Sequence, residues 1–101
     1  MVSRLDLQVL LEDIMESRNV YFQPPSTLKM KYPAIRYELN SIENVHADNK
    51  VYKQHNSYKI ILIDDDPDSK YVDKLSKLPK CSFTTSYPSD GLNHWVFKLY
   101  F

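Results

Sequence analysis

The run Ile60-Ile61-Leu62-Ile63 is apolar at every position, so a strand that contains it has no face suited to open water. Side chains on a strand alternate between the two faces of its sheet. A strand from Tyr58 to Ile63 is therefore predicted to lie in the middle of a sheet, with at least partial cover on each side. The rest of the chain has to supply its neighbouring strands and that cover.

Two segments have the spacing of amphipathic helices. The first, residues 4 to 17, has Ser3 placed to cap it and an apolar residue at each of i, i+3, i+4 and i+7. The second is predicted to begin at Pro67, where a missing N–H costs nothing, with Asp66 as its N-cap, and to end near Lys77. The apolar stripes of the two helices are Leu7, Leu10, Leu11 and Ile14, and Tyr71, Val72, Leu75 and Leu78.

Three further strands are predicted from alternating apolar residues. They run from about 33 to 41, from Cys81 to about Tyr87, and, after the turn at 88–91, through the alternating residues Trp95, Phe97, Leu99 and Phe101. The order is α-β-β-α-β-β, which predicts an α+β fold: a mostly antiparallel four-stranded sheet with two helices packed on it. Because the last strand reaches the final residue, removal of the last few residues is expected to damage the fold.

The chain of 101 residues is predicted to form a single domain, 1–101, since two independent cores of half this size would be too small. Hydrophobic residues make up 43% of it, which is enough for a core. Eight of the residues are tyrosines. Tyrosine is enriched in interface cores but also suits the edge of a monomer's core, and both interpretations stay open.

Charge and cysteine content exclude several classes of protein. Thirteen basic and thirteen acidic residues cancel, so the chain lacks the positive surplus that drives most nucleic-acid binding. The first residues form no long apolar run, which predicts neither a signal peptide nor a membrane span and indicates synthesis in the cytoplasm. A lone cysteine, Cys81, fits a reducing compartment and is interpreted as a small buried apolar residue.

The segment Val20-Tyr21-Phe22-Gln23-Pro24-Pro25-Ser26 places large rings and prolines where a small domain normally has polar turn residues. Proline fixes φ and pushes the preceding residue toward extended geometry, so the segment is predicted to be a stiff arm that leads into a strand. It either contacts a partner or clamps over its own sheet. Further on, the polar stretch 43–56 is predicted to be a long loop, either functional or simply mobile.

The residues that carry chemistry form no catalytic, cofactor or metal site. Asp64, Asp66 and Asp68 have the spacing of a calcium loop, but Ser69 and Leu75 occupy the places of its glycine and glutamate. The three histidines lack zinc-site spacing, and the single glycine excludes a phosphate loop. A row of lysines on the second helix is interpreted as a solvated face or, alternatively, as a docking surface for an acidic partner: Lys70, Lys74, Lys77 and Lys80.

Taken together, several short motifs resemble those of the tail terminator (tail completion, head–tail joining) proteins of tailed bacteriophages, over nearly the whole chain. The motifs are Val20-Tyr21-Phe22-Gln23-Pro24-Pro25-Ser26, Tyr32-Pro33 with Ile35 and Tyr37, Ala47-Asp48-Asn49-Lys50 with Tyr52, Ile63-Asp64 with Asp66-Pro67-Asp68-Ser69, and Leu92-Asn93-His94. The resemblance implies a β-sheet with helices packed on it. The chain departs from the family pattern at Asp65, where many relatives carry a basic residue.

The resemblance also implies a role in the virion. Tail terminators close the finished tail tube as a hexameric ring and present a surface on which the head, through its head-completion (stopper) protein, docks. DNA transits the lumen of that ring without specific binding. We expect a homo-oligomer of this kind, located in the neck of the virion, with no enzymatic activity and no cofactor. Such rings are head-to-tail assemblies, so each subunit needs two different contact faces.

Two groups of residues are the candidates for these contacts. Those for the subunit or tail-tube interface are Tyr21, Phe22, Pro24, Pro25, His46, Asp48, Asn49 and Tyr52. Asp64 and Asp65 are candidate lumen or loop residues: carboxylates that face a lumen would repel DNA and let it slide, whereas carboxylates that face solvent or a neighbour's lysine would have no bearing on DNA. The alternatives are a head-completion or stopper protein of the same neck, and a small cytosolic protein-binding module; an enzyme is a third, less supported choice.

Overall fold

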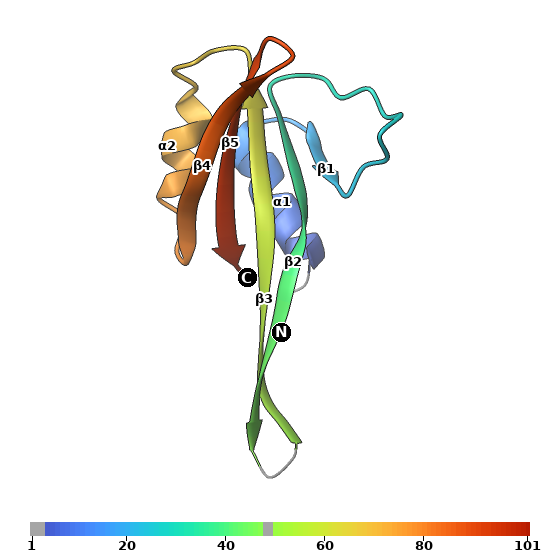
Figure 1. Ribbon diagram of the computed structural model, residues 1–101, viewed down its shortest axis with the longest axis vertical. Helices are drawn as coiled ribbons and strands as arrows, with labels where there is room; N and C mark the ends of the chain where they lie inside the picture. The colour runs from blue at the N-terminus through green and yellow to red at the C-terminus, as the bar shows by residue number, and fades with distance from the viewer. Residues whose placement is uncertain (1–3, 48–49) are drawn as a thin grey trace.

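The structure is a computed structural model that describes residues 4–47 and 50–101 (Figure 1). The fold is α+β with two helices and a mostly antiparallel sheet, as predicted, but the sheet has five strands where four were predicted, and the additional strand is paired in parallel, which makes the sheet mixed. In chain order the elements are α1 (Arg4–Met15), β1 (Val20–Phe22), β2 (Ala34–Ala47), β3 (Lys50–Asp64), α2 (Lys70–Ser76), β4 (Cys81–Ser89) and β5 (Leu92–Tyr100).

The strand order across the sheet is β1-β2-β3-β5-β4, with β1 parallel to β2 and every other pair antiparallel. The prediction that the strand through Ile60–Ile63 is central is confirmed. The unpredicted strand, β1, has three residues, too few for an alternating pattern to be visible in the sequence. It is fixed by backbone hydrogen bonds at both ends, from Ile35 to Asn19 (2.9 Å) and from Gln23 to Tyr37 (2.9 Å).

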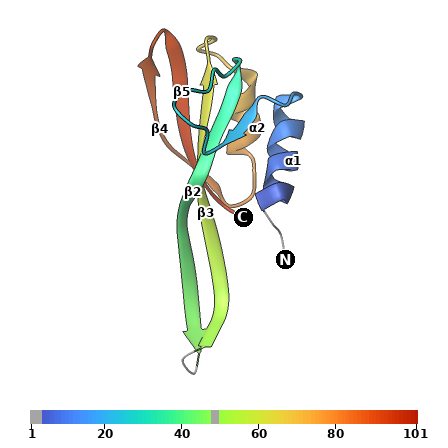
Figure 2. The same ribbon diagram turned by 90° about the vertical axis from the view of Figure 1, so that its right-hand side faces the viewer.

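Both helices lie on one face of the sheet, so the body has two layers (Figure 2). The core lies between them and includes Leu7, Leu11 and Met15 of α1, Leu75 of α2, and Ile35, Tyr37, Tyr58, Ile60, Leu62, Phe97 and Leu99 of the sheet. No described helix covers the other face. Even there, Ile63 and Val96 are only 3% and 5% exposed, which agrees with partial cover on each side of the central strand.

The helix boundaries differ from those predicted. The first helix ends at Met15 because Glu16 has a positive φ of 55°; its predicted cap, Ser3, lies outside the described residues. The second begins at Lys70 with Ser69 as N-cap, whose hydroxyl accepts a hydrogen bond from the N–H of Tyr71. Asp66 instead closes a local turn by accepting the N–H of Asp68 (2.9 Å). An aspartate side chain can stabilise a local turn as readily as a helix start, since both offer it backbone N–H groups.

The predicted loop at 43–56 is wrong, because β2 and β3 continue through it as a hairpin paired from Ala34↔Ile63 to Ala47↔Lys50. β1 pairs only with residues 35–37 of β2, and β5 only with residues 57–64 of β3. Residues 41–47 and 50–56 therefore form a two-stranded ribbon, here called the arm. It projects from the body and gives the molecule extents of 51 × 27 × 23 Å (Figure 1).

The C-terminal residues are tied into the sheet, so we expect deletion of residues 99–101 to destabilise the protein. Leu99 is 2% exposed, and the N–H of Phe101 donates to the carbonyl of Asn56 (3.0 Å). Loss of a buried leucine alone costs roughly 3 kcal/mol, so the melting temperature should fall by at least about 10 °C. Thermal unfolding followed by circular dichroism measures this. Ser82→Ala, on the exposed edge strand, is the control and should melt like the wild type.

Candidate functional site

Phe22, a predicted interface residue, lies against its own body. Its ring centroid is 5.0 Å from that of Tyr37, and the guanidinium of Arg4 sits 4.4 Å from the Phe22 ring centroid. Tyr37 is buried; its hydroxyl donates to Gln8 and accepts from Arg4. Burial raises the pKa of the Tyr37 hydroxyl, against the lowering effect of Arg4, so this residue stays a neutral donor. The ring of Phe22 therefore packs on the core and holds β1 against it.

The segment after β1 is more open. In the proline loop (residues 23–33), Pro24 is half-buried, Pro25 is exposed, and the N–H of Leu28 donates to the Pro25 carbonyl (3.0 Å). The half-buried Tyr21 accepts the Lys31 N–H at its hydroxyl (3.4 Å), which ties the loop back to β1. The loop presents apolar and basic side chains to solvent: Leu28 and Tyr32, each 43% exposed, and the exposed Lys29 and Lys31.

The remaining predicted interface residues belong to the arm. His46 lies on β2, paired with Val51, and Tyr52 lies on β3; their side chains are outside the described residues. Asp48 and Asn49 are outside the described residues altogether. The structure therefore places His46 and Tyr52 near the far end of the arm, remote from Tyr21 and Phe22 on the body (Figure 1).

The two candidate lumen residues are in different environments. Asp64 is 5% exposed and accepts the N–H of Asp66 (3.1 Å), so its carboxylate organises the turn after β3. Asp65 is exposed, as are Asp66 and Asp68. Residues 64–68, here called the acidic loop, thus present three carboxylates to solvent. Within the described part of the chain, no group of three or more His, Cys, Asp or Glu is placed to hold a metal ion.

A pocket of about 260 Å³, here called the aromatic pocket, lies beside the acidic loop and was not predicted. The rings of Tyr87 and His94 stack across β4 and β5, with centroids 4.9 Å apart and planes at 11°. A second hollow of about 390 Å³ shares two lining residues with it and is also lined by Asp68 and Asp73. The residues that line the aromatic pocket are Pro67, Ser86, Tyr87, Pro88, Asn93, His94 and Trp95.

The sequence does contain a signal for this pocket. Asp90 and Gly91 form a two-residue turn with positive φ at both positions, the geometry favoured in tight hairpins. Counting outward from that turn pairs Ser89 with Leu92 and Tyr87 with His94. The Nδ1 atom of His94 is buried and has no hydrogen-bond partner among the described residues. A buried polar atom without a partner is costly, so a ligand that supplies one would be favoured.

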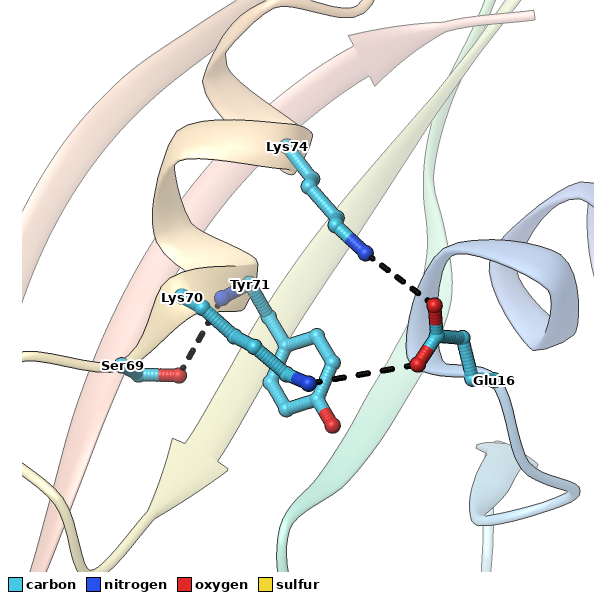
Figure 3. A network of polar contacts seen from close by, with 5 residues as sticks. All are labelled: Glu16, Ser69, Lys70, Tyr71 and Lys74. Carbon is cyan, nitrogen blue, oxygen red and sulfur yellow. Dashed lines mark hydrogen bonds and ion pairs between the residues drawn. The ribbon is translucent and has the colours of Figure 1, made fainter.

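The two lysines within α2, Lys70 and Lys74, point toward Glu16 (Figure 3), while Lys77 and Lys80 follow the end of the helix. Glu16 at the end of α1 lies 3.9 Å from the amine of Lys70 and 3.6 Å from that of Lys74, while Lys77 pairs with Asp73 at 2.9 Å. Exposed ion pairs of this kind contribute at most about 1 kcal/mol each. Their acidic neighbours compensate part of the positive charge, which favours the interpretation of this row as a solvated face.

Cys81 is half-buried at the start of β4, less enclosed than predicted, and lies opposite Leu99. Burial raises the pKa of its thiol. A raised pKa leaves less thiolate at neutral pH, and the thiolate is the reactive form. The side chain therefore has the properties of a packing residue and lacks those of a nucleophile.

Neither described helix is long and apolar enough to cross a membrane. The arrangement as a whole offers surfaces for binding: a projecting arm, an exposed proline loop at one edge of the sheet, and an aromatic pocket beside an acidic loop at the other. Comparison of the chain with protein-family models, with curated proteins and with solved structures returned no match.

Proposed function

We propose that this protein is a structural subunit of a bacteriophage neck, a tail-terminator-like protein that assembles head to tail into a ring on the end of the tail tube. The observation that carries the proposal is the arm. An isolated two-stranded hairpin is marginally stable in water, and both edges of this one lack a neighbouring strand in the described structure. A partner that pairs with or covers the arm would remove that weakness.

The body supports the same proposal, because its two lateral edges are unlike. One edge consists of β1 and the proline loop, which is basic, and the other of β4 and the aromatic pocket, beside the acidic loop. A closed ring requires two different, complementary faces on every subunit, whereas a twofold dimer uses one face twice. Unlike edges at opposite ends of one sheet meet the first requirement.

In this proposal the ring is hexameric, as the family resemblance implies, and its partners are the tail tube protein below and the head-completion (stopper) protein above. The arm is the element that reaches the tube. DNA transits the lumen of the ring without specific binding. The role is binding without turnover, and the protein resides in the virion neck after synthesis in the host cytoplasm.

The test is to mix the purified protein with the tail tube protein and to measure both mass and location. We expect native mass spectrometry to detect a hexamer, alone or on tubes, and electron microscopy to find the protein at one end of each tube, where it stops elongation. The proposal is wrong if tubes elongate unchanged and the protein stays free. Binding to the portal end of heads in place of tubes would identify a stopper protein.

A further inference from the structure

We infer that the proline loop of one copy docks into the aromatic pocket of a second copy, and that this contact joins neighbouring subunits. The inference rests on the proposed ring and names the chemistry of its subunit contact. Four observations support it: the composition of the pocket, the position of the two surfaces in the fold, their opposite charge, and their exposed apolar side chains.

The pocket has the composition of a site for a proline-containing segment. Tyr87, His94 and Trp95 supply ring faces, and Pro67 and Pro88 supply rigid apolar walls. Aromatic-lined grooves bind proline-rich segments because such segments are already extended and lose little entropy on docking. The proline loop begins with Pro24 and Pro25, followed by a turn closed between Pro25 and Leu28.

Position in the fold favours contact between copies. The proline loop follows β1, at one edge of the sheet, and the pocket is built on β4 and β5, at the other edge. The turn between β4 and β5, beside the pocket, lies at the end of the body opposite the arm, and the proline loop runs along the β1 side of the body up to the start of β2 at that same end (Figure 1). Rotation about an axis along the molecule's length keeps every feature at its own height. The loop of one copy then meets the pocket of the next, with all arms projecting from the same side of the ring.

The two surfaces carry opposite charge. Residues 23–33 contain Lys29 and Lys31 and no acidic residue, whereas the acidic loop beside the pocket exposes Asp65, Asp66 and Asp68. Asp68 also lines the hollow that adjoins the pocket. Complementary charges at the rim of an interface speed association and exclude wrong registers, and like charges placed there oppose binding.

Apolar side chains on both surfaces are exposed in the single copy. Leu28 and Tyr32 of the loop are each 43% exposed, and Tyr87 of the pocket is also 43% exposed. Burial of such side chains at the centre of an interface supplies most of its binding free energy, with charged residues around the rim.

Trp95, the only tryptophan in the chain, reports directly on the pocket it lines. The full-length variant with Lys29→Glu and Lys31→Glu has a defective loop and hence a vacant pocket, so it serves as receptor for a synthetic peptide of residues 22–33. We expect the wild-type peptide to give a saturable change in Trp95 emission, weakened by salt. A peptide with the two glutamate changes should bind at least about tenfold more weakly. Unchanged emission with both peptides overturns the inference.

A charge exchange tests the contact in the assembled protein. The variant Lys29→Glu with Lys31→Glu, and the variant Asp65→Lys with Asp68→Lys, should each fail to associate, because each sets like charges against one another. An equimolar mixture of the two should recover the assembly, since every contact in an alternating ring is then complementary. Lys59→Glu, exposed on the helix-free face of the sheet, is the matched control and should assemble normally.

The outcomes separate this inference from the proposed function. If all the charge variants still cap tail tubes as rings, the loop-to-pocket contact is wrong while the ring stands. If the mixture recovers association that the single variants lack, but nothing binds tubes, the contact stands and the neck function is wrong. Circular dichroism of each variant, expected to match the wild type because all four positions are exposed, confirms that it is folded.

Discussion

Replacement of residues 43–55 by a two-residue Asn-Gly turn will leave the body folded and abolish the tail-tube capping that the proposed function assigns to the arm. Ile42 and Asn56 are directly paired across β2 and β3, so a tight turn can join them, and Asn-Gly suits the type I′ geometry that hairpins favour. Residues 43–55 lie beyond the part of the hairpin that the rest of the sheet extends, because β1 pairs only with residues 35–37 and β5 only with residues 57–64. The melting temperature should therefore change by only a few degrees, because a lone ribbon adds little stability.

The affinity for tubes should fall by at least about a hundredfold, equivalent to about 2.7 kcal/mol of binding free energy. Sedimentation of the protein with tail tubes measures it, alongside a thermal melt of each variant. A second variant, with a flexible Gly-Ser linker of the original length in place of 43–55, separates the paired structure of the arm from its length. If either shortened or flexible protein caps tubes as well as the wild type, the arm is not the tube contact.

Phe22→Ala will destabilise the single subunit instead of acting only on assembly. The ring packs on Tyr37 and beneath the Arg4 guanidinium, and its loss removes the side chain that holds β1 against the core. Truncation of a half-buried phenylalanine costs roughly 2 to 3 kcal/mol, which corresponds to a fall in melting temperature of about 10 °C or more for a domain of this size.

Pro25→Ala, in the exposed part of the proline loop, is the matched control and should change the melting temperature by less than about 3 °C. Thermal unfolding of the two variants, with the wild type beside them, decides the matter. A Phe22→Ala protein that melts normally yet no longer assembles would restore Phe22 to the subunit interface, as the sequence alone predicts.

The elements that contribute apolar side chains to the core could be predicted from the sequence. Ile60–Ile63 identified the central strand, and the alternation through Trp95, Phe97 and Leu99 identified β5. The strands of the arm were not predicted, because a ribbon that no other layer covers needs no alternation of apolar and polar residues. Its strands therefore have the composition of a loop. β1 was not predicted because its three residues are too few to show an alternating apolar pattern. Its parallel pairing with β2 also depends on tertiary contacts, which a local pattern does not reveal.

The candidate contact residues were predicted only in part. Proline and ring chemistry singled out the stretch from Tyr21 to Pro25 as a candidate contact, but the sequence does not tell which of its side chains turn inward. The side chain of Phe22 turns inward because it packs between Arg4 and Tyr37, which are distant from it in the chain. The aromatic pocket depends on the Asp90-Gly91 turn, which sets the register that pairs Tyr87 with His94. Prediction of the pocket would have required that pairing to be known.

The separation of the arm from the core has a consequence for how such a protein can evolve. Residues 43–55 lie beyond the registers of β1 and β5, so substitutions, insertions and deletions there leave the pairing of the body's strands unchanged and carry little penalty in folding. The body can stay fixed while the arm varies in length and sequence. A lineage built on this fold can therefore change what its hairpin contacts without changing its body, and the greatest divergence among its members should fall in that hairpin.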